Sequence, residues 1–157
     1  MPSAMQLNPR FRWSLYAAFA VLFVTGVAWL FADRLKDSAN GETWQAVSAA
    51  LLTIHGGITM VTLLLLGALY PAHILRGWRR QKNRLTGTFM IAFNLFLIAT
   101  AFGLYYAGSE VLRPWISDVH TAVGLFLPPV ILVHVIVGRK SRRIQRDRWV
   151  DQDRSRR

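Results

Sequence analysis

The sequence predicts an all-α fold, a four-helix transmembrane bundle that makes residues 1–157 a single membrane domain. The chain is 53% hydrophobic and only 17% charged, and its charges are confined to a few short stretches. Four long stretches contain no Asp, Glu, Lys or Arg: residues 13–32, 43–75, 85–109 and 119–138. An α-helix needs about 20 predominantly apolar residues to cross the hydrocarbon core of a bilayer, so each stretch is long enough.

The first two helices are predicted over residues 13–32 and 44–72. Two arginines precede the first, as in a signal peptide, but its uncharged run is too long for one, and we interpret it as a retained signal anchor. Trp29 is expected at its outer membrane interface, where tryptophan is enriched. Pro71 is expected to end or kink the second helix, because proline lacks the N–H that a helix interior requires.

The third and fourth helices are predicted over residues 85–107 and 116–138, followed by a mixed-charge cytoplasmic tail over residues 139–157. The fourth helix carries Pro128 and Pro129 near its centre. Neither proline can donate a hydrogen bond to the preceding turn, so a kink is expected there. The tail is interpreted as a solvated or lipid-surface segment without an assigned function.

The basic residues lie mostly on one side of this arrangement. Sixteen of the nineteen Lys and Arg lie in the N-terminal arm, in the loop between the second and third helices, and in the tail. The positive-inside rule makes that side, with both termini, cytoplasmic, and the predicted location is a bacterial inner membrane. The net charge of +11 is therefore a signal of topology in the lipid bilayer. No folded basic surface remains for binding nucleic acid.

The four histidines of the chain lie in the second and fourth predicted helices. His120 and His134 are 14 residues apart, about 40° short of the same helix face and roughly 21 Å apart along the axis. His55 and His73 are 18 residues apart, which is five whole turns and roughly 27 Å. The two helices run in the same direction across the membrane. His55 and His120 therefore share the outer level, and His73 shares the inner level with His134.

Two cross-helix histidine pairs at two depths are the ligand set of two stacked bis-histidine haems between the second and fourth helices. Ionisable side chains inside a membrane are costly and usually functional. For a lone histidine an interhelical hydrogen bond is the ordinary alternative, and a proton relay is another. A divalent metal site would want carboxylates or thiolates, which the four uncharged runs lack. The absence of cysteine excludes disulfides, iron–sulfur clusters and covalently attached c-type haem, so the predicted cofactor is two haem b.

Three further residues are predicted to contact the haems. Gly124 would let the backbone approach a wide, flat porphyrin, although glycine is also common where membrane helices pack. Arg76 and Arg84, in the basic loop, are predicted partners of haem propionates. The same loop alternatively serves only as a topology determinant that rests on anionic lipid. A quinone site, an apolar slot with a few polar groups, is expected at the inner haem near these arginines, Asn83 and Thr86.

A four-helix bundle with His-x13-His on its last helix, here His120 and His134, resembles the bacterial di-haem cytochromes b. These include the cytochrome b subunits of membrane-bound formate dehydrogenases and hydrogenases, and the resemblance covers nearly the whole chain. Members of that group typically take one haem ligand from the first helix, which has no histidine here. Pairs on helices two and four are closer to the respiratory cytochrome b of bc complexes. There both pairs have similar spacing, whereas the first pair here is His-x17-His.

The resemblance implies electron transfer between a periplasmic redox partner, or catalytic subunit, and membrane quinone. The chain would be the electron-transfer subunit of an oxidoreductase complex rather than a catalyst alone. One alternative is a stand-alone quinone-linked oxidoreductase acting on a small diffusible reductant. Another is a haem-free membrane scaffold subunit. The short loops favour a partner, because the chain has no soluble substrate site of its own, and the four histidines argue against a pure scaffold.

Overall fold

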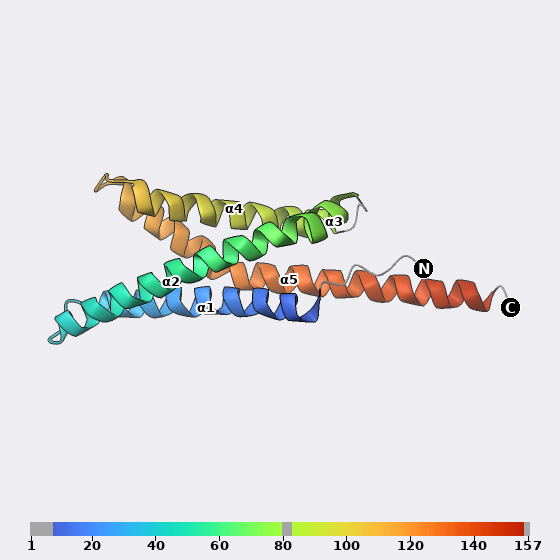
Figure 1. Ribbon diagram of the computed structural model, residues 1–157, viewed down its shortest axis with the longest axis horizontal. Coiled ribbons are helices and arrows are strands. Elements are labelled where there is room, and N and C mark those ends of the chain that lie inside the picture. The colour runs from blue at the N-terminus through green and yellow to red at the C-terminus, as the bar shows by residue number, and fades with distance from the viewer. Residues whose placement is uncertain (1–7, 80–82, 156–157) are drawn as a thin grey trace. The chain divides into compact units, whose positions relative to one another are not determined.

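The computed structural model describes residues 8–79 and 83–155, and within these ranges the regular structure is entirely helical (Figure 1). The predicted all-α class is confirmed. The elements are α1 (Pro9–Arg34), α2 (Gly41–Leu69), the π-helix η1 (Tyr70–Ile74), α3 (Leu75–Arg79), α4 (Arg84–Tyr106) and α5 (Leu112–Arg154).

Four helical stretches in the described part of the chain are long and apolar enough to cross a membrane. They are Pro9–Arg34, Gly41–Arg79, Arg84–Tyr106 and Leu112–Arg148, with mean hydropathies from 1.8 to 2.1 in their most apolar windows. Large apolar side chains such as that of Leu64, which is 77% exposed, cover their surfaces. Water would make such surfaces costly, whereas hydrocarbon does not. The chain is therefore a multi-pass membrane protein.

The described residues divide into two compact units, of which the first ends at Arg76 and the second begins at Gly77. In the first unit α1 packs against α2 as a helical hairpin. Its buried positions are mostly small residues: Ala18, Thr25 and Ala32 on α1, and Ser48 and Thr62 on α2. Small side chains let two helix backbones approach closely, which is how helices associate where lipid removes the hydrophobic driving force.

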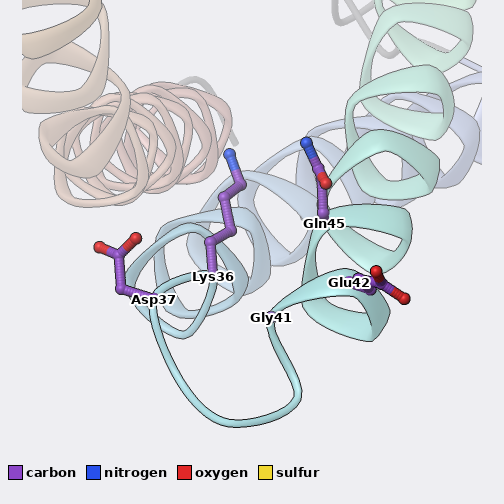
Figure 2. Close-up of a pocket in the computed structure, with 5 residues that line it drawn as sticks. All are labelled: Lys36, Asp37, Gly41, Glu42 and Gln45. Carbon is purple, nitrogen blue, oxygen red and sulfur yellow. The ribbon is translucent and has the colours of Figure 1, made fainter.

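The turn between α1 and α2 is polar, and Lys36 forms an ion pair there with Asp33. A Cβ atom at Gly41 would clash with the carbonyl oxygen of Lys36, so the entry into α2 requires glycine. An open hollow at this turn is lined by Lys36, Asp37, Gly41, Glu42 and Gln45 (Figure 2). The carboxylates of Asp37 and Glu42 point away from each other in this view, so they do not converge on a common ligand.

Helix α2 continues through η1 into α3 and does not end at Pro71, so the second span reaches Arg79, beyond its predicted end at residue 72. A π-helix closes its turns with i→i+5 hydrogen bonds. This wider turn accommodates a proline, which has no N–H to donate. His73 lies within η1. The prediction that His55 and His73 share one face assumed α-helical geometry throughout, and the π-helical turn changes the direction of His73.

The second unit is a hairpin of α4 and α5. Asn83 precedes α4 with a φ of 51°, in the left-handed region that asparagine tolerates better than most residues. Its Oδ1 accepts a hydrogen bond of 2.9 Å from the hydroxyl of Ser141 on α5. This bond ties the start of α4 to its partner helix.

Helix α5 is 43 residues long and includes Pro128 and Pro129 in its interior. Figure 1 shows that it bends along its length, as the proline pair predicts. The segment predicted as a tail from residue 139 is helical as far as Arg154. The part after Gly138 extends the helix by roughly 24 Å at the rise of an α-helix. The fourth helix is thus much longer than the predicted 116–138.

Candidate functional site

Each unit contains two of the four histidines. His55 lies on α2 and His73 on η1 in the first unit, and His120 and His134 both lie on α5 in the second. All four side chains are half-buried and belong to helical stretches long enough to span a membrane.

The ring of His55 is held by α1. Its Nδ1 lies 2.9 Å from the hydroxyl oxygen of Thr25, a residue that is only 7% exposed. The same hydroxyl donates back to its own helix, at 2.7 Å from the carbonyl oxygen of Val21 and 3.1 Å from that of Leu22.

The position of the proton on the imidazole depends on which group receives the proton of the threonine hydroxyl. A threonine hydroxyl has one proton to donate, and a backbone carbonyl oxygen can only accept. When Thr25 gives its proton to a carbonyl of α1, its lone pair is left to accept a proton from Nδ1 of His55. A neutral imidazole protonated at Nδ1 has its lone pair at Nε2. This is the tautomer that ligates a metal through Nε2.

The second unit repeats the arrangement. Nδ1 of His120 on α5 lies 2.8 Å from the hydroxyl of Thr100 on α4. That hydroxyl is 2.9 Å from the carbonyl oxygen of Phe96 and 3.1 Å from that of Leu97. The same reasoning assigns the proton of His120 to Nδ1 and its lone pair to Nε2.

His134 has a third, longer version of this contact. Its Nδ1 is 3.2 Å from the hydroxyl of Thr86, which is also 3.2 Å from the carbonyl oxygen of Asn83. Both distances lie at the long end of the hydrogen-bond range, so this interaction is weaker than the other two. The bond between Asn83 and Ser141 holds the same end of the hairpin together.

Three histidines therefore share one local geometry. In each case the threonine belongs to the first helix of a hairpin, the histidine to the second, and the nitrogen is Nδ1. The interhelical hydrogen bond, which is the ordinary alternative for a membrane histidine, is present in all three. It occupies the nitrogen that an Nε2 ligand does not use. His73 differs from these three because its backbone is π-helical rather than α-helical.

The backbone of α1 also packs against the His55 ring. An ideal Cβ at Gly26 would lie 3.4 Å from Cε1 of His55 and 3.8 Å from its Nδ1. The Nδ1–Cε1 edge of the imidazole thus faces Thr25 and Gly26. One turn further along α1, the indole Nε1 of Trp29 is buried without a hydrogen-bond acceptor among the residues that the structure describes.

The other predicted site residues lie on separate elements. Arg76 is exposed on α3 in the first unit. Arg84, at the start of α4, donates a 3.0 Å hydrogen bond to the carbonyl oxygen of Trp78, and its guanidinium lies 5.5 Å from the centre of that indole. A Cβ at Gly124 would meet Leu97 at 3.9 Å, an ordinary contact, so the packing of α5 against α4 does not by itself require glycine there.

Within the described residues no three His, Cys, Asp or Glu side chains gather into a group that could hold a metal ion. A bis-histidine haem uses a different donor set, two imidazoles for each iron. The chain matches no protein-family model, and no curated protein or solved structure matches it.

Proposed function

We propose that the chain is a membrane di-haem cytochrome b, which transfers electrons between a periplasmic redox partner and membrane quinone. The observation that carries this proposal is the repeated threonine contact at Nδ1 of His55, His120 and His134. With each threonine as the acceptor, the lone pair of each ring would lie at Nε2. Metal-ligating histidines almost always donate their other N–H in this way, which orients the ring and raises its basicity.

The residues present fit a haem in two further respects. The N–H of Trp29 is a buried donor for which the carboxylate of a haem propionate is a suitable acceptor. Gly26 keeps the backbone of α1 close to the His55 ring, so the imidazole is held on one edge.

In the proposed arrangement His55 and His120 hold the outer haem, because the two helices that carry them run in the same direction. His73 and His134 hold the inner haem by the same reasoning. Arg76 and Arg84 bind propionates on the cytoplasmic side, and Gly124 gives clearance to the porphyrin. Two of these imidazoles on one haem would fill its ligand positions, so the group would supply electron transfer rather than oxygen binding.

The chain's own residues orient the imidazoles and exclude water. Apolar side chains surround the histidines along each span, where unpaired charge is costly. Electrons would enter from a periplasmic protein and leave to quinone near the basic loop, or flow in reverse. The short loops favour a partner protein as donor over a small diffusible reductant.

A second candidate is a haem-free membrane subunit whose histidines only link helices. The same threonine–histidine bonds favour it, because interhelical hydrogen bonds stabilise membrane bundles without any cofactor.

Haem quantitation separates these two functions. We expect the chain purified in detergent to contain two haems, both removed by acid–acetone extraction because there is no cysteine to bind them covalently. A reduced-minus-oxidised optical spectrum identifies them as b-type. A content near zero would overturn the proposal in favour of the haem-free subunit. A content of one haem per chain would show that the inner pair, to which His73 belongs, does not bind haem.

The proposed orientation has its own test. Both termini are cytoplasmic in this proposal, because most Lys and Arg lie on their side. A reporter fused after Arg157 should therefore report the cytoplasm, and one inserted within residues 34–42 should report the periplasm. The same side for both would mean an even number of spans between them, instead of the three that the described part of the chain provides.

A further inference from the structure

We infer that Thr25 and Thr100 are positioning residues, which hold His55 and His120 in the Nδ1-protonated tautomer. In this way the two threonines lower the reduction potential of the haem iron that these histidines would ligate. Thr86 has the same role, more weakly, toward His134. The inference rests on the proposed haem function and adds to it the groups that tune one haem relative to the other.

The two strong contacts are nearly identical although they occur in separate hairpins. Thr25 is 2.9 Å from its histidine, and Thr100 is 2.8 Å from its own. Each hydroxyl donates to the carbonyls three and four residues earlier in its helix, at 3.1 and 2.7 Å for Thr25 and at 3.1 and 2.9 Å for Thr100. Other threonines such as Thr62 also bond their own helix, so what distinguishes Thr25 and Thr100 is the histidine nitrogen at the same hydroxyl.

The back-bonding to the helix gives the contact its direction. A freely rotating hydroxyl could donate to Nδ1 and leave the lone pair of the imidazole on the wrong nitrogen for an Nε2 ligand. Because the carbonyls of α1 and α4 take the hydroxyl protons, Thr25 and Thr100 act as acceptors. Threonine is thus suited to this task by its place on a helix, where its own backbone sets the orientation of its hydroxyl.

An acceptor at Nδ1–H increases the electron density at Nε2. A more basic axial ligand stabilises oxidised iron relative to reduced iron, so the potential falls. Both ligands of the proposed outer haem, His55 and His120, have such an acceptor at 2.9 Å or less. Of the inner pair, His134 has one at 3.2 Å, so the effect of Thr86 is smaller.

The test uses valine, which has the shape of threonine but no hydroxyl, and serine, which keeps the hydroxyl. In Thr25→Val and Thr100→Val we expect about tenfold weaker haem binding by the apoprotein, the lower end of what such orienting groups contribute. Potentiometric titration of the loaded protein should show one of the two haems shifted to a higher midpoint potential. Thr25→Ser and Thr100→Ser should restore both values.

Thr62→Val is the matched control. Thr62 is 4% exposed, lies in the same hairpin as Thr25, and donates to the carbonyl oxygen of Ile58 at 2.8 Å. The control removes a buried, back-bonded hydroxyl that is not aimed at a histidine nitrogen. It should leave haem affinity and both potentials unchanged.

Two outcomes would overturn the inference, and they are distinguishable. If the wild-type chain holds two haems and the Thr25→Val and Thr100→Val variants match it in affinity and potential, the threonines are structural and the proposed function stands. If the wild-type chain binds no haem, the proposed function fails together with the inference. The two valine substitutions lie in separate hairpins. If one variant does not accumulate, the other still decides whether the threonines act on the haem or only on the structure.

Discussion

Replacing His120 by alanine should remove the outer haem, or convert it to a high-spin form, and leave the second haem low-spin. In the proposed arrangement the iron at the outer level would lose one of its two imidazole ligands, whereas His134 lies roughly 21 Å away along the helix and would keep its own iron. Low-temperature electron paramagnetic resonance of the purified variant measures this directly, because each bis-histidine haem gives its own low-spin signal.

The other three histidines give the complementary results. His134→Ala should remove the inner signal and keep the outer one. His55→Ala should reproduce His120→Ala, and His73→Ala should reproduce His134→Ala, because helices that run in parallel bring these pairs to matching depths.

Two patterns among these variants would contradict the proposal in different ways. If His73→Ala leaves both low-spin signals, His73 is not a ligand, and its place in η1 with the long His-x17-His spacing explains why. If His55→Ala instead groups with His134→Ala, the spans that carry them run antiparallel, and the proposed topology is wrong.

A large side chain at Gly26 should displace His55 and eliminate the outer haem without any change to a ligand. In Gly26→Ala the new Cβ would lie 3.4 Å from Cε1 of His55, an ordinary contact, so haem content should stay near that of the wild type. In Gly26→Leu the carbons beyond Cβ need the space of the imidazole itself. Overpacking of this kind costs about 1–3 kcal/mol, enough to move the ring out of the geometry that an axial ligand requires.

Haem content and the outer low-spin signal are the measurements for the Gly26 series. Gly138→Leu is the control, because a Cβ there meets nothing within 4 Å. Two haems with unaltered spectra in Gly26→Leu would show that α1 does not hold the His55 ring in place.

The position of the membrane spans along the chain follows from the sequence alone. A run of about 20 uncharged apolar residues must be helical in hydrocarbon, because no other partner exists there for its backbone groups. This requirement depends only on the residues of each stretch, so the four predicted spans coincide in position with α1, α2 and its continuation, α4, and α5. The same reasoning predicted that the fourth helix ends at residue 138, which is too early. Charged residues mark where a helix leaves lipid, but they do not end its backbone hydrogen bonding, and α5 continues to Arg154.

Other local features were only partly predictable. Pro71 was expected to disturb its helix, and it does, but whether a proline ends a helix, kinks it or widens it into a π-turn depends on its neighbours. Asn83 was identified as a polar residue of the basic loop. Its left-handed backbone and its bond to Ser141 depend on how the start of α4 packs against α5.

The sequence identified the four histidines as the candidate ligands, and the tertiary structure decided how three of them are held. Four histidines on apolar spans stand out in the sequence because such side chains are rare in lipid. Their threonine partners do not, since a threonine that bonds its own helix is ordinary in any membrane span. Thr25 and Thr100 lie 30 and 20 residues from their histidines, and no periodicity links positions on different helices. Only the packing of α1 on α2 and of α4 on α5 brings each hydroxyl to a ring nitrogen.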